Sequence, residues 1–143
     1  LQYLGVKHGL APQSADQTYE MQWFYETDKD HGDVENAGKA LFMADCTEEF
    51  LDIAVNNKTK LMDKWEARWA DGRKHVSGET MTAADFSLLV FTTSVLHNAG
   101  LKNPVYGTRL QAIVDARPNV KRVIDNIRSE NQAAIDAMPT SAF

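Results

Sequence analysis

The chain is poor in the residues that cross-link, interrupt or anchor a protein. Of its 143 residues, one is cysteine, four are proline and eight are glycine. A lone Cys46 cannot form an internal disulfide, and it excludes a paired-cysteine redox or metal motif. No apolar run approaches the roughly 20 residues that cross a bilayer. The start lacks the basic and apolar blocks of a signal peptide. We therefore expect neither a disulfide framework nor a membrane partner.

Basic residues are also in deficit. The 15 Lys and Arg residues face 20 Asp and Glu residues, which gives a formal net charge of −5. Such a chain has no general attraction for nucleic acid, so we expect no nucleic-acid partner. The histidines have neither helical pairing nor a nearby cysteine, so no metal site is expected. They are His8, His31, His75 and His97.

The spacing of apolar residues predicts a single all-α domain. The prolines and glycines fall between segments with helical periodicity, and no segment alternates as a strand does. We expect a bundle of about five or six helices around a buried central helix. The expected helical ranges are 1–8, 14–31, 37–43, 47–70, 83–96, 105–116 and 118–137.

The central helix has the clearest start signal in the chain. Thr82 is a suitable N-cap, and Asp85 lies three residues later, as in a capping box. Asp85 is the only charge between Ala83 and Leu96. A helix that is apolar nearly all round is buried, and a buried carboxylate must accept backbone N–H groups. We therefore assign a structural, not a chemical, purpose to Thr82 and Asp85.

Four segments, in this order, carry a resemblance to a known family. They are YLGVKHGLAP, LMDKWEARWADGRKHVSG, SGETMTAADFSLL and ARPNVKRVI. Together they resemble the all-helical C-terminal domain of cytosolic glutathione transferases. The resemblance implies that residues 1–12 are the end of a thioredoxin-like domain helix with its linker, and that residues 13–143 form the helical domain. Since the chain begins inside such a helix, we expect further residues upstream.

The resemblance also implies a function. These enzymes join the glutathione thiolate to an electrophilic carbon, with glutathione as co-substrate and no other cofactor. The thiol-activating and main glutathione-binding residues of the family lie upstream of the region matched here. No catalytic residue is therefore assigned, and Tyr3 is not the family's catalytic tyrosine. The implied protein is a cytoplasmic homodimer that takes a small hydrophobic electrophile.

Accessory site residues follow from the same resemblance. Asp30 matches an acidic residue that reaches the γ-glutamyl ammonium of glutathione on the partner subunit. The alternative is that DKDHGDVE is a solvated acidic bend. Apolar residues matching the electrophile site are alternatively core residues. They are Trp23, Phe24, Leu41, Phe42 and Met43.

A second class of function stays open. The chain is alternatively a non-catalytic helical module of the same family, used to assemble other proteins into a larger complex. The absence of a thiol activator and of an aromatic wall residue near Ala40 favours this alternative, whereas Asp30 favours the enzyme. A carrier of apolar molecules is a third possibility.

Overall fold

The computed structural model describes residues 2–31, 43 and 46–138. Within these residues there is no strand, and only an isolated antiparallel bridge joins His75 to Gly78. The all-α prediction is confirmed, while the helix expected at 37–43 falls almost entirely outside the described residues. The helices are α1 (Gln2–Lys7), α2 (Ala15–His31), α4 (Glu48–Arg68), α5 (Ala83–Phe91), the π-helix η1 (Thr92–Leu96), α6 (Pro104–Asp115), α7 (Pro118–Glu130) and α8 (Gln132–Asp136).

Two helices break where continuity was expected. The expected helix over 83–96 turns into a π-helix after Phe91, and the N–H of His97 bonds the carbonyl of Thr92 five residues back. The hydroxyls of Thr92 and Thr93 both donate to the Leu89 carbonyl at 2.9 Å. Threonine hydroxyls that bond to the preceding turn distort a helix, which accounts for the change of register.

The last expected helix, over 118–137, is likewise two helices. Asn131 separates α7 from α8, and its side-chain amide donates to the Ile127 carbonyl at 2.8 Å. A side chain that satisfies the end of one helix competes with continuation of that helix. The prediction of one continuous helix was therefore wrong at Asn131.

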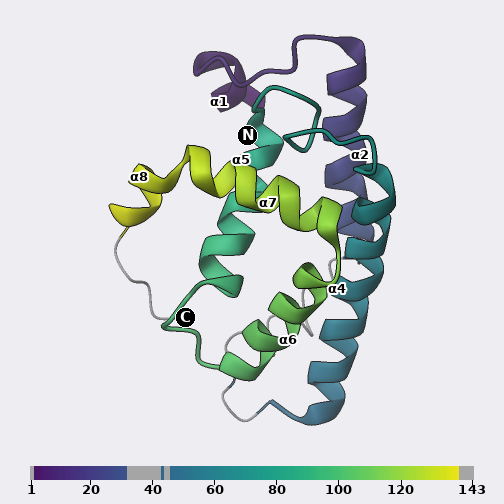
Figure 1. The fold of residues 1–143 in the computed structure, drawn as a ribbon, viewed down its shortest axis with the longest axis vertical. Helices are drawn as coiled ribbons and strands as arrows, with labels where there is room; N and C mark the ends of the chain where they lie inside the picture. The colour runs from purple at the N-terminus through teal and green to yellow at the C-terminus, as the bar shows by residue number, and fades with distance from the viewer. Residues whose placement is uncertain (1, 32–42, 44–45, 139–143) are drawn as a thin grey trace.

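The bundle is organised around α4 and α5. In Figure 1, α2 and α4 lie side by side, and α7 crosses α5. The long helix α4 also contacts α6 and α7, while α5 also contacts α1 and α2. The Trp65 ring stacks against both Phe24 (centroids 5.1 Å apart) and Trp69 (5.4 Å) in the main core, and Phe24 also stacks against Trp69 (6.4 Å). Aromatic packing thus joins α2 to α4.

The capping box at the start of α5 forms in the interior. Asp85 is fully buried, and its carboxylate accepts the Thr82 N–H at 2.7 Å and the Val76 N–H at 2.9 Å. Burial raises the pKa of Asp85 above its ordinary value, against the opposing effects of these N–H donors and of nearby His75. The helix itself is less enclosed than expected, because the Val90 side chain is 60% exposed.

The start of α7 is fastened to α4 by polar contacts. The Glu66 carboxylate accepts the N–H groups of Asn119 (2.9 Å) and Val120 (3.0 Å), which have no partner within their own helix. Arg122 donates to the Trp69 carbonyl at 2.6 Å, beyond the end of α4. The segment ARPNVKRV therefore joins the start of α7 to α4 and to Trp69, the residue that follows α4.

A charged cluster ties α2 to the end of α4 and the following loop. Arg68 binds both oxygens of Glu20, at 2.6 and 3.1 Å, and Arg73 reaches the same carboxylate at 2.7 Å. Burial alone would raise the pKa of Glu20. The hydrogen bonds from Arg68 and Arg73 outweigh burial, so the pKa lies below its ordinary value of 4.5.

Replacing the buried carboxylate is expected to destabilise the whole domain. Asp85→Ala leaves the N–H groups of Val76 and Thr82 without partners, so we expect a loss of about 2–4 kcal/mol. Urea unfolding followed by circular dichroism measures this. The matched control is Asp16→Ala, an exposed carboxylate in the first turn of α2, with a loss below about 0.5 kcal/mol. Equal losses of unfolding free energy in the two variants would contradict the proposed structural role of Asp85.

The Glu20 cluster predicts a dependence of stability on pH. Because the folded-state pKa is lowered, the unfolded state binds more protons, so this stabilisation is present above pH 4.5 and is lost as the pH falls through the folded-state pKa. We expect Glu20→Gln to unfold about 1–2 kcal/mol more easily at pH 7. The two unfolding free energies should converge as the pH falls through and below the lowered pKa of Glu20. A constant difference across this range would refute the assignment.

Candidate functional site

A small hollow lies where α2, α4 and α5 meet, and we call it the aromatic hollow. Its volume is about 130 Å³. Each of the three helices contributes an aromatic side chain to its lining, and polar side chains complete it. The lining residues are Phe24, Asp28, Lys58, Trp65, Ser87, Leu88 and Phe91. Apolar walls with a few polar groups are the usual composition of a small-molecule site.

Lys58 brings a positive charge to the aromatic hollow. Its side chain is only 15% exposed, and its ammonium lies 5.7 Å from the centroid of the Phe91 ring. The carboxylate of Asp28, which is half exposed, lies 3.5 Å from the ammonium. This distance is longer than the 2.7–2.9 Å typical of a charge-assisted hydrogen bond. The ammonium therefore keeps donor capacity for a further acceptor.

Trp65, which also lines the aromatic hollow, carries a buried hydrogen-bond donor. The residue is 3% exposed, and its indole Nε1–H has no hydrogen-bond partner among the described residues. A buried donor without a partner costs free energy, so native structures rarely keep one unless something else satisfies it.

Phe91, the third aromatic residue of the lining, lies where the helix type changes. Phe91 is the last residue of α5, directly before the π-helix η1. Short π-helical turns are uncommon and occur frequently at functional sites. The aromatic hollow thus lies beside the most irregular helical turn in the described part of the chain.

Two tyrosines are unsuited to act as bases. Burial raises the pKa of Tyr25, whose ring packs edge-on against Phe24. Burial also raises the pKa of Tyr106 to about 12. Both phenols remain protonated at neutral pH, and neither has the lowered pKa that activates a neighbouring thiol.

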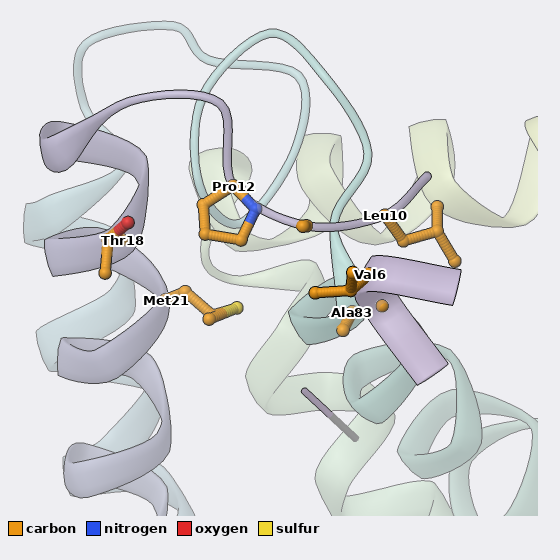
Figure 2. A pocket seen from close by; sticks show the side chains of 8 residues that line it. Val6, Leu10, Pro12, Thr18, Met21 and Ala83 are labelled. Atoms are coloured by element: carbon orange, nitrogen blue, oxygen red, sulfur yellow. The ribbon is translucent and has the colours of Figure 1, made fainter. Parts of the chain in front are cut away.

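A second cavity, which we call the apolar hollow, lies at the other end of α2. It measures about 300 Å³ and is bounded by α1, the connection to α2, and the start of α5. Figure 2 shows Thr18 and Met21 on one side and Val6 and Ala83 on the other. The Thr18 hydroxyl already donates to the Ser14 carbonyl. With so little polar chemistry available, this cavity suits packing better than ligand recognition.

Three of the five residues expected to line the electrophile site have side chains in the described part of the structure. Phe24 contributes to the core and also lines the aromatic hollow. Trp23 is absent from that lining, and its ring lies 5.4 Å from the Arg68 guanidinium, while Met43 is 46% exposed. Leu41 and Phe42 lie outside the described residues. The backbone of Asp30 belongs to α2, and its side chain falls outside the described part.

Lys58 and Trp65 were not predicted as site residues. In the sequence, Lys58 belongs to the charged face of the long helix, and Trp65 belongs to its apolar face. Only the arrangement of α2, α4 and α5 in space shows that both residues line one cavity. The one signal for this pair in the sequence was its spacing, because Lys58 precedes Trp65 by seven residues, which is two turns of a helix.

Searches against protein-family models, curated proteins and solved structures gave no match. None of the helices in the described part of the chain has the length and hydrophobicity needed to span a membrane. Across residues 2–31, 43 and 46–138, no group of three histidine, cysteine or acidic side chains is placed to hold a metal ion.

Proposed function

We propose that this chain is the helical, electrophile-binding part of a glutathione transferase. The observation that supports this best is the buried Asp85 carboxylate, which accepts the N–H groups of Thr82 and Val76 at the start of α5. This is the segment that carries the strongest resemblance. A second resembling segment, ARPNVKRVI, contains the start of α7. The Glu66 carboxylate accepts the N–H groups of Asn119 and Val120 in this segment.

In this proposal the chain holds the electrophile and does not activate the thiol. The aromatic hollow supplies flat walls in Phe24, Trp65 and Phe91, and Lys58 supplies a positive charge. The glutathione thiolate, activated by a thioredoxin-like domain, forms a bond from sulfur to an electrophilic carbon, and the leaving group departs with the bonding electrons. Asp30 remains the candidate contact to the partner subunit's glutathione in a cytoplasmic homodimer.

One observation favours the alternative, an assembly module. Tyr3 and Val6 of α1 are 74% and 71% exposed, and Val6 lines the apolar hollow. Exposed apolar surface of this kind is often an interaction site. In a transferase, the same surface would be covered by the thioredoxin-like domain, whereas in an assembly module it would receive another protein.

The natural protein decides between the two proposals. We expect an intact mass well above the 16.0 kDa of this chain, retention on immobilised glutathione, elution by free glutathione, and conjugation of an aryl halide. Intact-mass spectrometry and absorbance of the thioether product measure these properties. The control is the same matrix carrying cysteine, which should retain nothing.

The opposite result is equally definite. A natural species of 16.0 kDa that passes through the glutathione matrix and co-purifies with other proteins would refute the enzyme and support the assembly module. Binding of an apolar dye without any turnover would support a carrier.

A further inference from the structure

We propose that the aromatic hollow binds an aromatic carboxylate with a single six-membered ring, placing the ring among Phe24, Trp65 and Phe91 and the carboxylate on Lys58 and the Trp65 indole N–H. This proposal deepens the proposed function. It rests on that function only for the claim that the bound ligand is a substrate. The binding itself is measurable without catalysis.

The volume limits the ligand to one ring. A dry apolar cavity of about 150 Å³ holds one benzene molecule, and the aromatic hollow measures about 130 Å³. Two fused rings would exceed this space without movement of the helices.

The walls favour an aromatic ring over a saturated one. Phe24 and Trp65 lie 5.1 Å apart with an interplanar angle of 26°, and Phe91 and Leu88 belong to the facing helix. Aromatic rings gain about 0.5–1.5 kcal/mol beyond their buried area from offset or edge contacts with such walls. A cyclohexane ring of similar size gains only the burial.

The polar groups select a negative charge. The Lys58 ammonium has three donors, and its contact to Asp28 is long at 3.5 Å. The Trp65 N–H is a neutral donor that is buried and has no partner among the described residues. In the proposed complex the ligand carboxylate accepts from Lys58, in place of the long contact to Asp28, and from the Trp65 N–H. Benzoate is therefore the simplest probe.

The three tryptophans provide a direct measurement. Each contributes one indole N–H signal to a nitrogen–proton correlation spectrum, and Trp65→Phe identifies the Trp65 signal. We expect benzoate to move that signal downfield in a saturable manner, because the N–H gains an acceptor. Cyclohexanecarboxylate, benzamide and acetate should each bind at least several-fold more weakly.

Lys58→Met removes the charge and keeps most of the side chain's apolar stem. We expect the Kd for benzoate to rise roughly ten- to hundredfold, the range for one hydrogen bond to a charged group. The Kd for benzamide should change less than threefold. The matched control is Lys60→Met, an exposed lysine on the same helix, which should leave both constants unchanged. Thermal melting verifies that all three variants are folded.

Each other outcome overturns the inference in a recognisable way. Equal binding of benzoate and acetate would mean ion pairing at the surface. Equal binding of benzoate and benzamide would refute selection by charge while leaving the electrophile proposal intact. A Trp65 signal unmoved by any aromatic probe would refute the aromatic hollow as a ligand site. Glutathione retention by the natural protein tests the transferase proposal separately.

Discussion

The structure depends on one buried carboxylate. Asp85 is fully enclosed, and an ionised group in that position is tolerated only because N–H groups from two different places converge on it. One donor, Thr82, belongs to the helix start, and the other, Val76, belongs to the preceding loop. The N–H of Ala83 in turn binds the Leu10 carbonyl at 3.1 Å. The Asp85 side chain thereby joins the loop to the start of α5, and the Ala83 N–H joins the start of α5 to the α1–α2 connection.

The helix α4 supplies the frame onto which these parts are packed. Its apolar face carries Trp65 into the ring stack with Phe24, while its polar edge presents Glu66 to the first N–H groups of α7. Apolar burial supplies most of the stability, and the polar contacts select the register. Residues of α2, α4 and α5 meet around the small space that remains, the aromatic hollow.

Local signals in the sequence predicted local structure well. Thr82 with Asp85 predicted a helix start, and Pro118 predicted another, because each acts within one turn. The π-helix after Phe91 was not predicted, since threonines at 92 and 93 are common in ordinary helices. The Glu20 cluster was also missed, because Arg68 and Arg73 lie 48 and 53 residues away in the chain. Contacts at such separations follow from packing, which periodicity does not specify.

The same limit explains why the candidate site had to come from the structure. Lys58 would ordinarily be read as a solvated charge, yet it is held beside the Phe91 ring with little exposure. Its ammonium lies 3.5 Å from the carboxylate of half-exposed Asp28, which lines the same hollow. The Trp65 N–H is buried and has no partner among the described residues. A buried donor without a partner costs free energy, so the Trp65 N–H favours a ligand that brings an acceptor to this cavity.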